Sequence, residues 1–414
     1  DDADAVSVTS TVNYEDQGHE SFETLQHKVI PLAAQQLLVS SSNIAVERLK
    51  GGSYNRVIGV TLNTRGLSRK YTLKWVREYL QGLFGKHTTE KYVIRIPRFD
   101  SAGMEDDIAV LELAASHLTF PVPRTISFDA TDSNALGKAY VIQRRLEGQQ
   151  VSELWNSLNF AQKCSFARQV TRLSGEIAAV TSPAAGVIFS GHKTGHSSGP
   201  VPLKTFSVPP SEGHDTENLD KPLDWPSTPQ TSLDFMLSQC ERWREYYLSQ
   251  DMDLDDTWNA FADIARSMHK RGLLPTEDLF QLSHQDLEPY NILITIKNEK
   301  TVEITGVLYW DGAVFAPSFM FRSTFWLWSG VDDEDEDENT ALGEPETEEG
   351  KELKKIFLEG TEPRLLTHAF SSECAVARRF FGLLRDGMFS DSAFDLADIL
   401  IAEWIELHPE DGIV

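Results

Sequence analysis

The sequence predicts an α+β protein with a bilobal architecture: a β-rich N-terminal lobe and a mainly helical C-terminal lobe. Three observations predict it. The 414 residues are too many for one small hydrophobic core. Runs rich in β-branched residues dominate up to about residue 145, whereas apolar residues recur at helical spacing after about residue 150. One hairpin, predicted at 291–309, interrupts the helical part.

The N-terminal half divides into two segments. Residues 1–43 form an extension in which the apolar spacing from Ser21 to Val39 predicts a helix interrupted near Pro31. Residues 44–145 form the N-terminal lobe, which begins with a hairpin of "NIAVERL" and "YNRVIGVTL" around a glycine-rich turn, "KGGS". The lobe continues with a basic insert at 63–91, the strand "KYVIRIPR", the helix "MEDDIAVLELAASHL" and the strands "RTISFDA" and "KAYVIQRRL".

Residues 146–414 form the C-terminal lobe. Its helices are predicted at 151–158, 160–180, 232–249, 255–271, 351–359, 365–386 and 391–407. Residues 182–231 are rich in Pro, Gly and Ser and are expected to be irregular. The acidic loop 332–349 carries eleven acidic residues and no basic one. Both the acidic loop and the basic insert are expected to be solvated surface. The alternative is that they cover a binding site.

Composition narrows the function. Lys and Arg number 38 against 63 Asp and Glu, a net charge of −25, which argues against nucleic-acid or anionic-membrane binding. The three cysteines are far apart, which excludes a disulfide framework and indicates a reducing compartment. No apolar run is long enough for a membrane span, and the first residues do not read as a signal peptide. We therefore expect a cytoplasmic protein.

The stretch "LSHQDLEPYNILI" carries the strongest chemical signal. His284 precedes Asp286 by two residues, and Asn291 follows Asp286 by five. This HxDxxxxN spacing is that of a kinase catalytic loop at 284–291, because one loop must supply two groups to one site. Asp286 would orient an acceptor hydroxyl and receive its proton, while Asn291 would offer an oxygen to a magnesium ion.

Five stretches together resemble a known family: "LSHQDLEPYNILI", "ITGVLYWDGAVFAP", "GGSYNRVIGVTL", "YVIRIPR" and "FPVPR". They are similar to motifs of aminoglycoside phosphotransferase-like proteins, most of all to the large fungal branch of that phosphotransferase enzyme family, related to choline, homoserine and macrolide kinases. The resemblance covers roughly residues 40–405. It implies a protein-kinase-like fold and transfer of the ATP γ-phosphate to a hydroxyl of a small molecule.

The resemblance also implies a nucleotide site. The glycine-rich turn would be Gly51, Gly52 and Ser53, with Asn55 beside it, and its backbone amides could approach phosphates. Arg95 would take the place of the phosphate-reaching lysine, paired with Asp107. The backbone from Gln143 to Arg145 would meet the adenine edge. Asn291 would be one metal ligand, and Asp311 is the carboxylate that could supply a second.

One residue departs from the family pattern. In "GVLYWDG" Tyr309 stands where the magnesium-binding aspartate is expected, and a phenol is a poor ligand for a hard cation. Asp311, two residues on in an extended strand, would point to the same side and could capture the metal.

Three functions remain open. The first is a small-molecule kinase that uses ATP and Mg²⁺. The second is a repurposed fold without a cofactor, in which Asp286, His284 and Tyr309 perform acid/base chemistry such as isomerisation, elimination or cyclisation on a secondary metabolite. The third is a ligand-binding pseudokinase. The substrate and the oligomeric state are not determined by the sequence.

Overall fold

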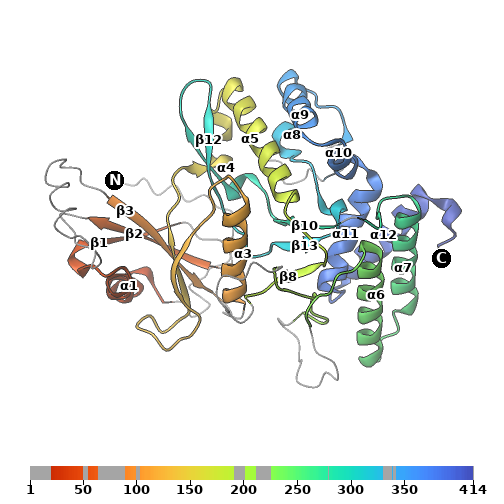
Figure 1. Cartoon of the computed structure of the whole chain (residues 1–414), viewed down its shortest axis with the longest axis horizontal. Coiled ribbons are helices and arrows are strands. Elements are labelled where there is room, and N and C mark those ends of the chain that lie inside the picture. The colour runs from red at the N-terminus through yellow and green to blue at the C-terminus, as the bar shows by residue number, and fades with distance from the viewer. Residues whose placement is uncertain are drawn as a thin grey trace. The chain divides into compact units, whose positions relative to one another are not determined.

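The computed structural model describes residues 20–49, 55–63, 89–98, 103–190, 201–210, 225–277, 279–329, 338 and 342–413. The chain forms two compact units, one of Asp1–Met104 and Pro123–Arg145, the other of Glu105–Val122 and Leu146–Val414 (Figure 1). The first unit is rich in strands and the second in helices, so the predicted α+β class is confirmed.

The first unit contains one five-stranded antiparallel sheet with the strand order β1-β2-β3-β5-β4. Its strands are β1 (Ile44–Arg48), β2 (Asn55–Asn63), β3 (Thr89–Pro97), β4 (Thr125–Asp129) and β5 (Tyr140–Arg144). β-branched residues alternate along the central strands, and those on the inner face, among them Ile94 and Ile142, are fully buried. The basic insert between β2 and β3 lies largely outside the described residues.

Helix α1 (Phe22–Leu37) completes the core of the first unit. The predicted interruption near Pro31 is wrong: the helix runs through Pro31. Leu25, Val29 and Leu32 lie on one face and are buried with the sheet residues, so tertiary packing outweighs the hydrogen bond that a proline cannot donate.

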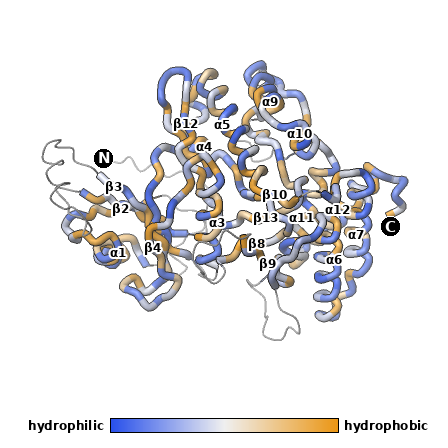
Figure 2. The backbone as a smooth tube through the Cα atoms, viewed as in Figure 1, coloured by the Kyte–Doolittle hydropathy of each residue, from blue (hydrophilic) through white to orange (hydrophobic). Residues whose placement is uncertain are grey.

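The second unit contains ten helices among the residues that the structure describes. They are α3 (Met104–His117), α4 (Val151–Leu154), α5 (Phe160–Ala178), α6 (Ser232–Ser249), α7 (Asp255–Lys270), α8 (Trp326–Ser329), α9 (Glu348–Gly360), α10 (Pro363–Phe370), α11 (Ser372–Asp386) and α12 (Asp391–Leu407). Hydrophobic and hydrophilic residues alternate along α6 and α7 (Figure 2), as expected for helices with one buried face.

One predicted helix is in fact two. The segment 365–386 was expected to be continuous, but α10 ends at Phe370 and α11 begins at Ser372. Ser371 has an extended backbone, and its Oγ accepts a hydrogen bond from the Cys374 amide at 3.2 Å. The capping serine therefore separates α10 from α11. The apolar spacing continues across the break and so does not reveal it.

Two small antiparallel sheets carry the loops of interest. One has the order β7-β10-β13-β8-β9 and the other β12-β11-β6. Their strands are β6 (Gln149–Gln150), β7 (Thr181–Ser182), β8 (Gly186–Ile188), β9 (Leu203–Lys204), β10 (Phe280–Ser283), β11 (Ile292–Ile296), β12 (Val302–Val307) and β13 (Val314–Ala316). The predicted hairpin at 291–309 is thus confirmed as β11 and β12. The segment 182–231 is less irregular than expected, since it includes β8 and β9.

This topology brings two loops together. The loop 284–291 connects β10 to β11, and the segment 308–313 connects β12 to β13. Because β10 pairs with β13 and β11 pairs with β12, with Ser283 opposite Val314 and Ile292 opposite Val307, both connections leave the sheets at neighbouring positions.

Candidate functional site

His284 holds the two loops in place. Its ring is buried, and Nε2 lies 2.8 Å from the carbonyl oxygen of Leu308, so Nε2–H is the donor. Nδ1 then accepts a hydrogen bond from the Asp286 amide at 3.3 Å. Burial lowers the pKa of His284 to about 4, although the Leu308 carbonyl and the negative charges of Asp286 and Asp311 oppose the shift. His284 is therefore a neutral imidazole with both nitrogens engaged.

The side chain of Asp286 is held from within its own loop. The Nδ2 group of Asn291 donates to the Asp286 backbone carbonyl at 2.8 Å and to carboxylate Oδ2 at 2.7 Å. Asn291 also accepts a hydrogen bond at its backbone carbonyl from the Leu308 amide at 2.8 Å. The spacing of five residues thus lets the buried side-chain amide of Asn291 hydrogen-bond both the backbone and the carboxylate of Asp286.

The second oxygen of Asp286 has a partner that the sequence analysis missed. The hydroxyl of Tyr290 donates to Asp286 Oδ1 at 2.6 Å. Burial and then this hydrogen bond raise the pKa of the Tyr290 phenol. Tyr290 stands in the quoted motif, but nothing in its spacing indicates a side chain turned back onto the carboxylate.

Another carboxylate on this loop is neutralised by an arginine. Glu288 forms an ion pair with Arg322, 34 residues further along the chain. Burial raises the pKa of Glu288, and the guanidinium charge opposes that shift. The pair ties the loop 284–291 to the segment that follows β13.

The segment after β12 does not continue as an extended strand. Tyr309 has φ +58°, a left-handed conformation that is uncommon for a bulky residue. Trp310 then enters the core: its ring contacts the His284 ring at a centroid distance of 4.5 Å, and its Nε1 donates to the Val307 carbonyl at 3.0 Å. The expectation that Asp311 follows Tyr309 on one side of a strand is therefore wrong, because Asp311 lies in the turn closed by Ala313 N–H and the Trp310 carbonyl.

The donor groups at this site fit a magnesium ion in part. Oδ1 of Asn291 is fully buried and has no hydrogen-bond partner among the described residues, so an oxygen ligand is available there. Asp311 directly follows Trp310, whose ring contacts the His284 ring, so a second oxygen donor lies in the adjoining segment. No group of three or more His, Cys, Asp or Glu residues arranged for a metal occurs in the described part of the chain, so most ligands would have to come from phosphate and water.

The predicted nucleotide residues are divided between the two units. Gly51, Gly52 and Ser53 lie outside the described residues. Within the first unit Asn55 begins β2, Arg95 lies in β3, Gln143 lies in β5 and Arg145 directly follows β5. In the second unit Asp107 lies in the first turn of α3.

The structure shows the surroundings of Gln143 and Arg145. The Gln143 side chain is 4% exposed, and its Nε2 has no hydrogen-bond partner in the part of the chain that the structure describes. Arg145 donates its backbone N–H to the Lys91 carbonyl at 3.0 Å and forms an ion pair with Glu47. A role of these residues in nucleotide binding stays a prediction.

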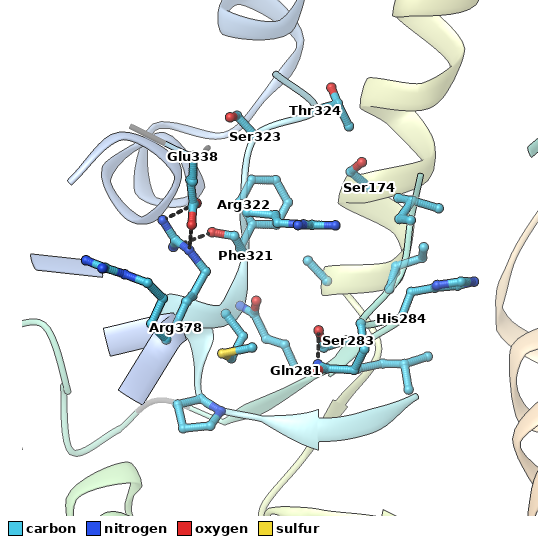
Figure 3. A pocket seen from close by; sticks show the side chains of 18 residues that line it. Ser174, Gln281, Ser283, His284, Phe321, Arg322, Ser323, Thr324, Glu338 and Arg378 are labelled. Atoms are coloured by element: carbon cyan, nitrogen blue, oxygen red, sulfur yellow. Dashed lines mark hydrogen bonds and ion pairs between the residues drawn. The ribbon is translucent and has the colours of Figure 1, made fainter. Parts of the chain in front are cut away.

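A cavity of about 280 Å³ borders the loop within the second unit (Figure 3). Gln285 and Leu287, the two neighbours of Asp286 in the chain, line it, and so does Arg322. At another wall Arg378 reaches Glu338 and the Phe321 carbonyl, as Figure 3 shows. The cavity is therefore lined by both the loop 284–291 and helix α11.

A family model matches the part of the chain that contains the loop 284–291. The family model described as "Phosphotransferase enzyme family" matches residues 83–329, more than half of the chain. A subtelomeric hrmA-associated cluster protein of Aspergillus fumigatus is 25% identical over 83 residues, which are 20% of this chain and 16% of that protein. The same protein from a second strain matches equally. The match thus spans about a sixth of the length of these curated relatives.

Solved structures of aminoglycoside phosphotransferases are similar along most of their length. The GDP complex of wild-type aminoglycoside 2'-phosphotransferase-IIIa has 16% identity and a TM-score of 0.45, with 91% of this chain and 98% of that chain covered. A thermostable mutant of aminoglycoside phosphotransferase APH(4)-Ia, in a ternary complex with ADP and hygromycin B, has 15% identity and a TM-score of 0.45, with 91% and 98% covered.

Proposed function

The chain belongs to the phosphotransferase enzyme family, and from that premise we propose that it transfers the γ-phosphate of ATP to a hydroxyl of a small metabolite. One observation carries the proposal. A single buried amide, that of Asn291, holds the Asp286 carboxylate with its nitrogen and leaves its oxygen without a hydrogen-bond partner among the described residues. The Asn291 side chain thus both holds the base for the acceptor hydroxyl and offers an oxygen ligand for the metal.

The His284, Asp286 and Asn291 side chains of the loop would have different roles in this reaction. Asp286 accepts the proton of the acceptor hydroxyl and orients its oxygen toward the phosphate. Asn291 and Asp311 would hold a magnesium ion, which would offset the negative charge of the phosphates. His284 is a positioning residue, because neither of its nitrogens is available to a substrate. The expected nucleotide contacts come from Asn55, Arg95, Asp107, Gln143 and Arg145 with the glycine-rich turn.

We propose the cavity beside the loop as the place where part of the acceptor binds. Its volume of about 280 Å³ suits a small metabolite rather than a polymer. Its walls include Gln285, Leu287 and Arg322, so a molecule bound there lies against the loop that carries Asp286.

Tyr309 favours a second candidate, a cofactor-free acid/base enzyme. In that reaction Asp286 would remove a proton and the Tyr309 phenol would donate one to a secondary metabolite. This candidate requires no metal, so the replacement of the usual aspartate would not impair it. It predicts an activity that needs no nucleotide and is unchanged by EDTA.

Calorimetric titration with ATP separates the two candidates. The phosphotransferase predicts binding that requires magnesium, is lost in EDTA and weakens in Asp311→Asn. A screen of hydroxylated metabolites for ADP release would then follow, with Asp286→Asn as the inactive reference that still binds ATP. Absence of ATP binding in both buffers would refute the phosphotransferase and leave the acid/base enzyme.

A further inference from the structure

The contact between Tyr290 and Asp286 has a consequence beyond the proposed phosphotransferase, on which it rests. Oδ2 of Asp286 is taken by the Asn291 amide at 2.7 Å. Oδ1 is the oxygen that remains for an acceptor, and the Tyr290 hydroxyl is bonded to it at 2.6 Å. A hydroxyl of the chain itself thus makes the hydrogen bond that an acceptor hydroxyl must make.

Tyr290 is placed so that it can leave this position. The residue is 47% exposed, whereas its neighbours Pro289 and Asn291 are buried in the same short 3₁₀ turn. Rotation of the tyrosine side chain therefore requires no change in the turn that holds Asn291. An incoming acceptor can approach from solvent on the side where the ring is exposed.

We propose that Tyr290 occupies the acceptor position on Asp286 and decides which hydroxyl reaches the base. A hydrogen bond to a charged group is stronger than one between neutral partners, so an acceptor must bring further contacts to displace the phenol. Water makes no such further contacts and therefore does not displace the phenol from Asp286. Tyr290 is thereby a specificity-determining residue that suppresses hydrolysis of ATP and admits hydroxylated metabolites.

The test measures the rate of phosphate release from Mg·ATP in the absence of any acceptor. Tyr290→Phe keeps the ring and removes the hydroxyl, so water can bind to Asp286. We expect the hydrolysis rate to rise on the order of tenfold, the effect of one hydrogen bond to a charged group. Tyr290→Phe combined with Asp286→Asn should show no such rise, because the gain acts through the carboxylate.

Two controls accompany this test. Tyr246→Phe removes the same atom from helix α6 and should leave hydrolysis at the wild-type rate. Thermal unfolding of each variant excludes a change in folding as the cause. A Tyr290→Phe protein that binds ATP and hydrolyses it no faster than the wild type would overturn the inference while leaving the phosphotransferase intact. If no variant binds ATP, both proposals fall.

Discussion

Tyr309 departs from what its position favours in two ways. Its backbone is left-handed, a conformation in which Asn and Asp are more frequent than large aromatic residues. Its side chain is also a poor magnesium ligand. Such strained residues persist where the surrounding structure holds them, here the buried Trp310 on one side and the Leu308 backbone bonds on the other.

Tyr309→Asp is expected to tighten magnesium-dependent ATP binding and to raise phosphoryl transfer. It adds the carboxylate that the family resemblance implies at this position, and aspartate also suits the left-handed backbone. Tyr309→Asn is the matched control, because it suits the backbone equally but brings no charge. Calorimetry with ATP in magnesium and in EDTA distinguishes them. Equal behaviour of the two variants would show that the metal does not bind beside residue 309.

His284 is expected to make the stability of the protein depend on pH. Its pKa in the folded state is about 4, below the ordinary value of 6.5, so between these values the unfolded chain binds more protons than the folded one. Its contribution is complete above pH 6.5 and is lost as the pH falls toward 4. Between pH 7 and pH 5 the loss amounts to roughly 2 kcal/mol of the free energy of unfolding.

Urea unfolding at the two pH values checks this dependence. His284→Gln keeps a hydrogen-bonding side chain but cannot titrate, so its free energy of unfolding should fall by less than that of the wild type. The same decrease in both proteins would assign the pH dependence to other groups.

Helix α11 anchors the segment that lines the cavity. The Arg378 guanidinium donates through Nη1 to the carbonyls of Phe319, Phe321 and His368 at 2.6, 3.0 and 2.9 Å. Phe319 lies in the 3₁₀ turn Ser318–Met320, Phe321 directly follows that turn, and His368 lies in α10. One side chain from α11 thus fixes two other segments.

Arg378→Leu is expected to reduce the free energy of unfolding by about 3–5 kcal/mol, since it leaves three carbonyls and Glu338 without their buried partner. Arg379→Leu is the matched control on the same helix. Its side chain is 34% exposed and pairs with Glu403, so we expect a loss of about 0–1 kcal/mol. Chemical denaturation of both variants tests the difference. Similar losses would mean that burial of the cation does not decide its contribution.

Within the described part of the chain, the buried hydrophobic residues form two cores that share no residue. One joins α1 to the five-stranded sheet, and the other lies in the helical unit around α5, α6, α7 and α11. All tryptophans except Trp75 belong to the helical unit. Among the described residues, no helix is both long enough and apolar enough to cross a bilayer.

We expect the two units to unfold in separate transitions. With Trp75 replaced by Phe, tryptophan fluorescence reports the helical unit alone, while far-UV circular dichroism reports both. Ile94→Ala creates a cavity in the first core and should shift only part of the dichroism transition. Leu384→Ala, equally buried in α11, should shift the fluorescence transition. Coincident shifts by both probes in both variants would indicate one cooperative unit.

Features that depend on neighbouring residues were predictable from the sequence. Helices α6 and α12 were predicted with their observed bounds, because apolar periodicity and caps are local. Thr231 and Ser390, the capping residues, precede the first helical residues directly. The proximity of Asp286 and Asn291 was predictable for the same reason, since both lie within one loop.

Features that depend on contacts across the chain were decided by the tertiary structure alone. Burial against a sheet keeps α1 continuous through Pro31, and the packing of Trp310 on His284 accompanies the left-handed turn at Tyr309. Arg322 reaches Glu288 over 34 residues. The sequence by itself thus determined the family, the class of fold and the residues of the loop. The structure decided which atoms of those residues are engaged, because a hydrogen bond depends on distances that residue order does not contain.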